Sequence, residues 1–235
     1  MSRELKLFDD REFRRRLRPP TKRKCTWVTS PASQTWRNLD VNSTFRYIPP
    51  YDIPQVNPYV GSIPQRLVPY CNLSQATEID CPHFYMDDTR IPAMGNNIEH
   101  FTERLRRFRY VIAPDYTMFC GAPLVVNLRA LFLNRSIAAY WQEHGLNVIP
   151  SFNGGDAQSF DYCLAGMPRN SVIACGNVGV LQSSVTTTLW KCLVEKAIAE
   201  LKPIALMIYG TPIDFAFPSE LPVYWYPDFI HSKLR

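Results

Sequence analysis

Short apolar runs alternate with longer amphipathic stretches from about residue 81 to residue 210. The runs are apolar throughout, which is typical of strands buried on both faces of a parallel sheet. They lie at residues 83–86, 110–113, 148–149, 172–175 and 204–209. Between them, apolar residues spaced three and four apart predict helices over residues 98–108, 124–144 and 186–201. The pattern therefore predicts a domain of strand-then-helix units.

The ends of these predicted helices carry residues that start and stop helices. Asn97 has a side chain that caps a helix N-terminus, and it precedes the first stretch. Gly145 follows the second stretch, where a glycine commonly ends a helix. Pro203 stops the third, because proline lacks an amide donor.

Strands joined by helices imply right-handed crossovers and a parallel sheet. Five visible units do not fill an eight-stranded barrel. We therefore expect an α/β fold with a partial or irregular (β/α) barrel-like parallel sheet. An open doubly wound α/β sheet is the alternative. No GxGxxG pattern follows the first run, which disfavours dinucleotide binding.

The segment before this domain is rich in proline and tyrosine. Seven prolines and four tyrosines lie between residues 26 and 73. Since proline lacks an amide donor and fixes its own φ, we expect neither a regular helix nor a central strand there. We divide the chain into a basic N-terminal arm (1–25), a Pro/Tyr-rich extended strap (26–80) and an α/β domain (81–235). A strap that packs on its own domain and one that binds a partner fit equally well.

The formal charge of +5 hides an asymmetry between the arm and the rest. The arm holds ten Lys or Arg and four acids, which gives +6 and leaves 16 − 17 = −1 for residues 26–235. Such an arm can neutralise phosphates without reading sequence, so nucleic acid is one expected partner. The candidate contacts are the basic residues in its second half: Arg14, Arg15, Arg16, Arg18, Lys22, Arg23 and Lys24. A solvated tail or short charged helix is the alternative.

The residues just after each predicted strand are the candidates for a site, because the crevice of a parallel α/β sheet lies beyond the carboxyl ends of its strands. Carboxylates brought together there can bind Mg²⁺ or raise each other's pKa for acid–base work. We take Asp88 and Asp115 as the catalytic candidates. The ligand-binding candidates are Asp87, Tyr116, Asn153 and Asn177, with Arg135 on the second helix as an anion clamp.

The alternative is that these polar residues only make turns. Asp and Asn beside glycine also form tight turns and helix caps, and Asp87, Asp156 and Asn177 fit that role. The glycines at 154–155 and in 176–179 permit close backbone approach to a phosphate or carboxylate. No Walker lysine, HExxH or GxSxG pattern accompanies them.

The seven scattered cysteines form no paired CxxC spacing, so we expect reduced and mostly structural thiols. Cys71, Cys81 and His83 are too loosely spaced to predict a zinc site, and we assign no metal ligands. No run of about 18 apolar residues exists and the N-terminus is charged, so we expect neither a membrane span nor export. An intracellular location is the expectation.

Six short motifs in order resemble a known family. They are Asp87-Asp88, Ala113-Pro114-Asp115-Tyr116, Asn134-Arg135 with Tyr140-Trp141-Gln142, Gly145 before Val148-Ile149-Pro150, Gly176-Asn177-Val178-Gly179 and Tyr209-Gly210. The series is similar to the uncharacterised domain of unknown function 4417, which occurs in phages, plasmids and bacterial genomes. The resemblance covers residues 80–210. It implies that the protein comes from a mobile element, and it implies no particular activity.

Three functions fit these observations. The first is a nucleic-acid-associated phage or mobile-element protein, with the arm on phosphates and a strand-end acidic site. The second is a phage structural or interaction protein whose arm and strap bind other protein subunits. The third is a small-molecule enzyme that uses Asp88 or Asp115 as acid or base. We expect the cytoplasm of the host cell, or the virion for the second. The sequence does not decide whether the protein is an enzyme.

Overall fold

A computed structural model describes residues 44–91, 94 and 97–228. The arm and its seven candidate nucleic-acid contacts lie outside the described residues. Within them, the parallel strands form three short sheets that follow one another along the chain. β3 pairs with β4, β5 with β6, and β7, β8 and β9 form a three-stranded sheet. The strands are β3 (Leu67–Pro69), β4 (Cys81–His83), β5 (Val111–Ile112), β6 (Val148–Ile149), β7 (Val172–Gly176), β8 (Ala205–Tyr209) and β9 (Val223–Tyr226).

These sheets form an irregular parallel α/β architecture. One bridge between Ser151 and Ala174 links the chain after β6 to β7. The backbone pairings among the described residues do not close the series into a barrel. The predicted α/β class with an irregular parallel sheet is confirmed, whereas a closed ring of strands is absent from this part of the chain.

An apolar cluster receives side chains from successive strands. Its members include Cys81, Ile112, Ile149, Ala174, Met207 and Tyr226. The Tyr226 hydroxyl donates to the carbonyl of Pro64 at 2.6 Å. The last strand therefore lies against the segment that precedes β3, and both ends of the strand series contribute to one core.

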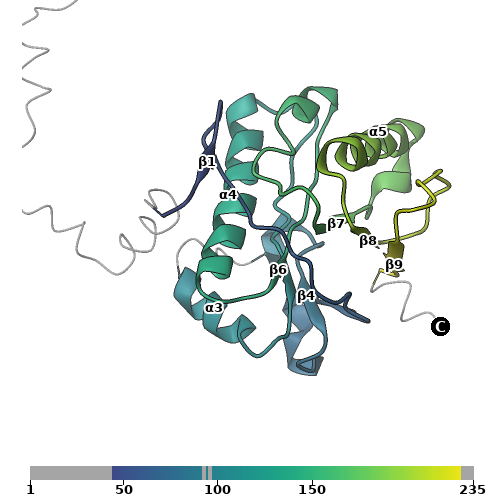
Figure 1. The fold of residues 1–235 in the computed structure, drawn as a ribbon. Helices are drawn as coiled ribbons and strands as arrows, with labels where there is room; N and C mark the ends of the chain where they lie inside the picture. The colour runs from purple at the N-terminus through teal and green to yellow at the C-terminus, as the bar shows by residue number, and fades with distance from the viewer. Residues whose placement is uncertain (1–43, 92–93, 95–96, 229–235) are drawn as a thin grey trace, which may run out of the picture.

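Three α-helices of the described residues pack outside the strands. They are α3 (Ile98–Leu105), α4 (Leu124–Glu143) and α5 (Ser184–Leu201). In Figure 1, α3 and α4 lie on the left of the strands, and α5 lies above β7 and β8. Trp141 of α4 and Val194 of α5 are completely buried, at 0% exposure. Two further apolar clusters thus hold the helices against the sheets.

The predicted cap at Asn97 and the predicted stops near Gly145 and Pro203 are confirmed, whereas α3 ends at Leu105, before the predicted 108, and α5 begins at Ser184, before the predicted 186. The Asn97 side chain caps α3 by accepting from the His100 amide at 3.4 Å. α4 ends at Glu143, and Gly145 follows it with a φ of +83° that favours glycine. α5 ends before Lys202, which has a left-handed backbone, and Pro203.

The first predicted strand, 83–86, is wrong in position, because β4 covers Cys81–His83. The Nδ1 atom of His83 accepts from the Tyr85 amide at 3.2 Å, so that amide is used locally and not in a strand pairing. The other predicted strands overlap the observed ones, with boundaries that differ by one residue or agree.

The described part of the strap, residues 44–80, is more regular than its prolines suggest. It forms the antiparallel pair β1 (Tyr47–Ile48) and β2 (Ile53–Pro54), the strand β3 and the 3₁₀-helix η2 (Tyr70–Gln75). Pro69 is the last residue of β3, and β3 has a backbone partner on one side only. Ile53 and Val56 are each 1% exposed. This segment therefore belongs to the core of the domain.

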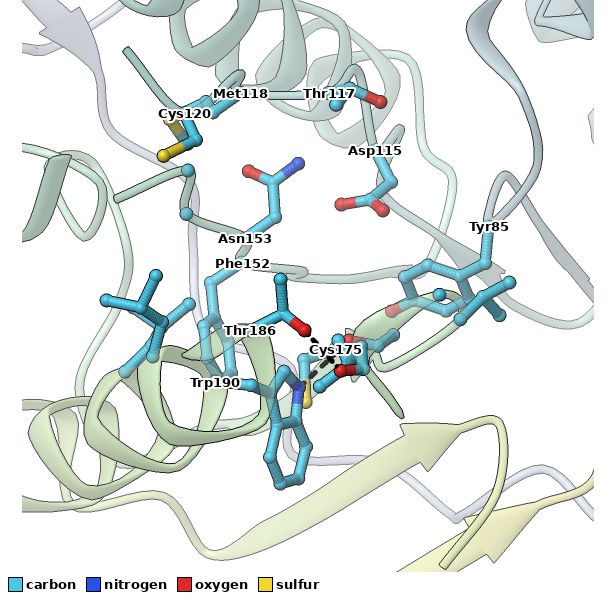
Figure 2. Close-up of a pocket in the computed structure, with 18 of the residues that line it drawn as sticks. Tyr85, Asp115, Thr117, Met118, Cys120, Phe152, Asn153, Cys175, Thr186 and Trp190 are labelled. Atoms are coloured by element: carbon cyan, nitrogen blue, oxygen red, sulfur yellow. Dashed lines mark hydrogen bonds between the residues drawn. The ribbon is translucent and has the colours of Figure 1, made fainter. Parts of the chain in front are cut away.

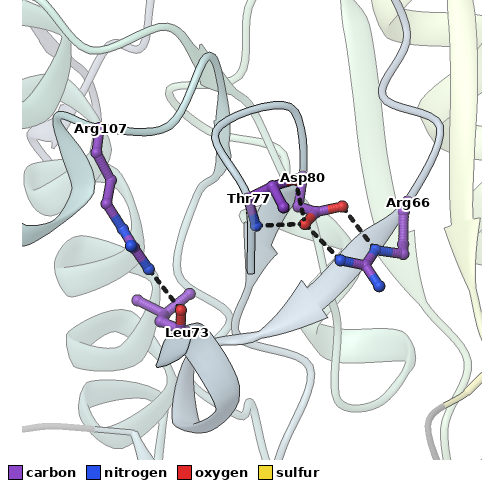
Figure 3. Close-up of polar contacts among 5 residues, drawn as sticks. All are labelled: Arg66, Leu73, Thr77, Asp80 and Arg107. Carbon is purple, nitrogen blue, oxygen red and sulfur yellow. Dashed lines mark hydrogen bonds and ion pairs between the residues drawn. The ribbon is translucent and has the colours of Figure 1, made fainter. Parts of the chain in front are cut away.

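The turn between η2 and β4 is held by one carboxylate. Asp80 is 3% exposed and accepts from the Arg66 guanidinium at 2.6 and 2.5 Å (Figure 3). It also accepts from the amide and hydroxyl of Thr77. The hydrogen bonds from Arg66 lower the pKa of Asp80 to about 2. In the same view, Arg107 donates to the carbonyl of Leu73.

Six described cysteines are free thiols, of which Cys81, Cys163 and Cys175 are buried. The other three are Cys71, Cys120 and Cys192, and they are exposed, so half of these thiols are not core residues. None of the described helices combines the length and apolar character needed to cross a bilayer.

Candidate functional site

A cavity of about 550 Å³ opens where the parallel strands end; we call it the strand-end pocket. Its walls come from the residues that follow β4, β5, β6 and β7, together with one side of α5. Figure 2 shows Asp115 and Asn153 above the space, with Tyr85, Cys175 and Trp190 around its lower part. A crevice at this place is what a parallel α/β sheet leads one to expect.

Asp115 is the most unusual polar residue of this pocket. Its Oδ1 atom is buried and accepts no hydrogen bond within the described chain. Burial raises the pKa of Asp115 to about 7, and the negative charge of Asp88 adds to this rise. The buried Arg135 and a hydrogen bond from Asn153 act in the opposite direction. The carboxyl group is therefore half protonated near neutral pH, which suits an acid–base group.

Tyr85 contributes a second unpartnered atom to the pocket. Its side chain is 7% exposed, and its buried hydroxyl makes no hydrogen bond. Burial raises the pKa of Tyr85, and the nearby Asp115 adds to this effect. The ring stacks 5.5 Å from those of His83 and Tyr209. Burial lowers the pKa of His83 to about 3, so this imidazole is neutral.

The loop that carries Asp115 is held from three sides. The Asn134 side chain bonds the amide of Tyr116 at 2.7 Å and its carbonyl at 3.1 Å. Asp88 accepts from the hydroxyl of Thr117 at 2.8 Å and from its amide at 3.2 Å. Asn153 donates to the Tyr116 carbonyl at 2.9 Å. The backbone that follows Asp115 is thus fixed by polar groups from other elements.

Arg135 lies beneath the pocket and does not line it. Only 1% of this residue is exposed, and its guanidinium donates to the carbonyls of Ser151, Cys163 and Ala165. All three contacts, at 2.8 to 3.1 Å, join chain segments that are distant in sequence. Arg135 therefore holds together the chain segments around the pocket. It does not reach into the pocket as the anion clamp that the sequence led us to expect.

The remaining acidic candidates make local turns. Asp87 lines the pocket, but its side chain caps η3 (Asp88–Arg90) by accepting from the Thr89 amide. Asp156 caps η5 (Ala157–Asp161) and accepts from the Gly121 amide at 2.8 Å. The hydrogen bonds of Asp87 and Asp156 therefore fit the alternative reading, in which these residues form turns and helix caps.

Asn177 supports the end of β7 behind the pocket. Its Nδ2 donates to the Thr211 carbonyl, while its Oδ1 is buried without a partner. Gly210 has a φ of +134°, and a Cβ at that position would lie 1.8 Å from this Oδ1. Glycine at 210 is therefore required by both the backbone and the closeness of Asn177.

The structure brings together Asp87, Asp115 and Asn153 in the lining of the pocket. Asp88, Tyr116, Asn177 and Arg135 lie outside that lining and support it. Among the described residues, no group of three or more His, Cys, Asp or Glu is placed to hold a metal ion. Asp88 accepts from the Thr117 hydroxyl outside the lining, and its negative charge contributes to the raised pKa of Asp115.

Sequence reasoning missed much of the lining. The sequence predicts a strand over 83–86, which includes Tyr85, and an amphipathic helix over 186–201, which includes Trp190. Both of these residues line the pocket, as do Phe152, Met118 and Phe119. The sequence does carry a signal for Tyr85, because this residue lies near the end of a predicted strand, where pocket residues are expected. For the apolar residues no local signal distinguishes the wall of a pocket from a core.

Comparisons with known proteins agree with the resemblance in sequence. The family model described as Domain of unknown function (DUF4417) matches residues 45–226. The match is wider than the 80–210 region in which the motifs lie. It includes the described hairpin of the strap and β9.

Two similar proteins come from mycobacteriophages. The Gene 1 protein of Mycobacterium phage L5 is 26% identical over 215 residues, which is 87% of this chain and 92% of that protein. The Gene 1 protein of Mycobacterium phage D29 is 24% identical over 215 residues, which is 87% of this chain and 78% of that protein. No solved structure matches the chain. The expected relation to a phage family is confirmed.

Proposed function

The chain belongs to the DUF4417 family, and we propose that it is an enzyme that binds a small molecule in the strand-end pocket, with Asp115 as its acid–base group. One observation carries this proposal. The Asp115 carboxyl lies in the wall of a cavity, its Oδ1 is buried without a partner, and its pKa is held at about 7. Burying a carboxyl group without a hydrogen-bond partner lowers the stability of the fold. Carboxyl groups with strongly shifted pKa values are concentrated at functional sites.

The support around Asp115 fits this role. Acid–base groups act on substrates only when their position is fixed. Asn134, Asn153 and Asp88 all hold the backbone next to Asp115. The Tyr85 hydroxyl faces the same space and can donate to a substrate atom beside the carboxyl group (Figure 2).

The first test is the titration of Asp115 in the full-length protein. Carboxyl ¹³C NMR of the wild type and of Asp115→Asn identifies the resonance by its absence from the variant. A midpoint near 7 supports the proposal. A midpoint near 4 contradicts it, because the carboxyl would then be an ordinary ionised group at neutral pH.

The second test is turnover. The full-length protein is incubated with a small-molecule extract of bacterial host cells, and the extract is followed by mass spectrometry. We expect the wild type to change at least one compound and Asp115→Asn to lose that change. Asp214→Asn is the matched control, because Asp214 is exposed and outside the pocket. Equal profiles for wild type and Asp115→Asn would contradict the enzyme proposal.

We also propose that the arm associates with nucleic acid, within the host cytoplasm. The support is the separation of charge, +6 in residues 1–25 against −1 in the rest. In the described domain, Arg104, Arg107 and Arg109 are exposed and take no part in its ion pairs. The guanidiniums of Arg104 and Arg109 lie 5.4 and 5.7 Å from an aromatic ring centre, which leaves their polar edges for phosphate contacts, whereas Arg107 already donates to the Leu73 carbonyl.

The test is double-stranded DNA binding as a function of salt. In the full-length chain, Arg15→Glu with Arg16→Glu should weaken binding and flatten the salt dependence by about one unit of slope for each lost phosphate contact. Arg169→Glu with Lys202→Glu is the charge-matched control on the domain surface. Equal losses in both double variants would mean a nonspecific effect of net charge. No loss in the arm variant would leave protein subunits as the arm's partner.

A further inference from the structure

Among the described residues, the lining of the strand-end pocket contains acidic groups and no cation. Asp87 and Asp115 are the charged residues in this part of the lining, which holds no described lysine, arginine or histidine. Arg135 lies nearby, but all its bonds go to carbonyls and it is 1% exposed. A phosphate or carboxylate entering the pocket would therefore meet acidic groups without a counter-ion on the surface, which is unfavourable.

Three amides of the glycine loops already have acceptors within the chain. The Asn177 amide donates to the Tyr209 carbonyl, and the Val180 amide donates to the Asn177 carbonyl. On the other loop, the Gly155 amide donates to the hydroxyl of Ser159 at 3.0 Å. These three amides are therefore not free to bind an anion.

The groups that are available in the pocket favour hydrogen-bond donors on the ligand. When ionised, the Asp115 Oδ1 is an acceptor only, and the Tyr85 hydroxyl both accepts and donates. The Tyr85 side chain is more than nine-tenths buried and faces the cavity. An ammonium, an amidinium or a ring N–H satisfies Asp115, whereas an anionic group repels it.

The rest of the wall is apolar and partly aromatic. Phe152, Trp190 and Leu193 form part of the lining. Towards the surface, Phe119 and Val178 also line the pocket and remain 51% and 57% exposed. Exposed apolar side chains at a cavity mouth favour contact with an apolar part of a ligand.

We infer that the strand-end pocket takes a neutral or positively charged nitrogen compound, in which a hydrogen-bond-donating nitrogen reaches Asp115 and Tyr85 and a flat apolar ring lies against Phe152 and Trp190. Phosphorylated and carboxylate compounds bind less well, because an ionised Asp115 repels them. The inference rests on the proposed function of this pocket and adds the charge class of its ligand. The nearby charged groups are Asp87, Asp88 and Arg135, and the nearby titratable groups are Tyr85 and Cys175.

Pairs of small probes with the same ring and opposite charge test this inference. ¹⁵N-labelled full-length protein is titrated at pH 8 with tryptamine, indole and indole-3-acetate, and with benzamidine and benzoate. We expect tryptamine and benzamidine to shift the amides around Asp115 and Phe152 with dissociation constants at least tenfold lower than their anionic counterparts, and indole to lie between. Equal or tighter binding of the anions, or no shift of pocket amides by any probe, overturns the inference.

Two variants separate charge from shape. Asp115→Asn should reduce the affinity for tryptamine at least tenfold and leave that for indole within about twofold, because the isosteric amide removes the charge, keeps the shape and retains one acceptor oxygen. Asp214→Asn should change neither value. Equal loss of indole and tryptamine binding in Asp115→Asn would show a collapsed pocket and would contradict the charge-based inference.

The outcomes distinguish this inference from the proposed function. If anions bind while Asp115 titrates near 7, the ligand class is wrong and the acid–base role stands. If cations bind but Asp115 titrates near 4, the ligand class stands and the acid–base role falls.

Discussion

The side-chain amide of Asn134 bonds both the N–H and the carbonyl of Tyr116, at 2.7 and 3.1 Å. Asn127, seven residues earlier on α4, does the same for Phe119, at 2.8 and 3.0 Å. Residues seven apart lie on the same face of a helix, so both asparagines face one loop. This loop carries Asp115 and part of the pocket lining, and α4 therefore determines where the candidate acid–base group lies.

Replacing Asn134 by alanine should loosen that loop. The variant leaves the Tyr116 amide without its acceptor and the Tyr116 carbonyl with Asn153 as its donor, and we expect the free energy of unfolding to fall by about 1–3 kcal/mol. Hydrogen exchange of the amides at 115–119 should become faster. The matched control is Asn147→Ala, which removes one exposed hydrogen bond to the Arg109 carbonyl and should cost less than about 1 kcal/mol. Unchanged exchange at 115–119 would mean that Asn134 does not fix the loop.

The pKa of Asp115 predicts how stability depends on pH. Its folded-state pKa of about 7 lies above the ordinary value of 3.8, so between these values the folded protein keeps a proton that the unfolded chain releases. Stability should therefore fall as the pH rises through this window, by up to about 1.4 kcal/mol per pH unit, and level off above pH 7.

Urea unfolding at pH 5, 6, 7 and 8 measures this contribution as a difference between variants. Asp115→Asn should lose the part of the slope that Asp115 causes and should be more stable than the wild type at pH 8. Asp214→Asn, at an exposed position, should keep the wild-type slope. Parallel curves for wild type and Asp115→Asn would contradict the raised pKa.

Arg135 should be essential for stability. Methionine at this position fills much of the same volume but removes the donors to three buried carbonyls, so we expect a loss of at least about 3 kcal/mol in unfolding free energy. Arg129→Met, on the exposed side of the same helix, should cost less than about 0.5 kcal/mol.

A second measurement links Arg135 to the pocket. Its positive charge lowers the pKa of Asp115, so the Asp115 carboxyl should titrate at a higher pH in Arg135→Met than in the wild type. This readout is taken by NMR under conditions where the variant is folded. A midpoint that stays the same or falls would rule out the electrostatic coupling.

Gly210→Ala should disturb the end of β8. A Cβ there would lie 1.8 Å from the Asn177 Oδ1, and the φ of +134° is one that other residues rarely adopt. Gly145→Ala is the control for the backbone effect, because its φ is +83° and nothing lies within 4 Å of the added carbon. We expect Gly145→Ala to cost about 1 kcal/mol and Gly210→Ala clearly more, as measured by thermal and urea unfolding. Equal costs would show that Asn177 moves aside freely.

The sequence by itself determined the class of the fold and the place of the pocket. The helical spacing in 186–201 and the cap at Asn97 depend on residues a few positions apart, so local rules were enough to predict α5 and the start of α3. The parallel arrangement then follows from strands alternating with helices, and it places a crevice at their carboxyl ends. Asp115 was found by this reasoning.

Only the tertiary structure decided which polar residues face the pocket and which hold its walls. Arg135 and Asp88 look like site residues in sequence, yet their partners are carbonyls of 151, 163 and 165 and the backbone of Thr117. Likewise, β3 arises in a proline-rich segment because it pairs with β4. Such pairings join positions that are far apart in the chain. Together these long-range contacts determine how deeply Asp115 is buried, and its burial sets its pKa.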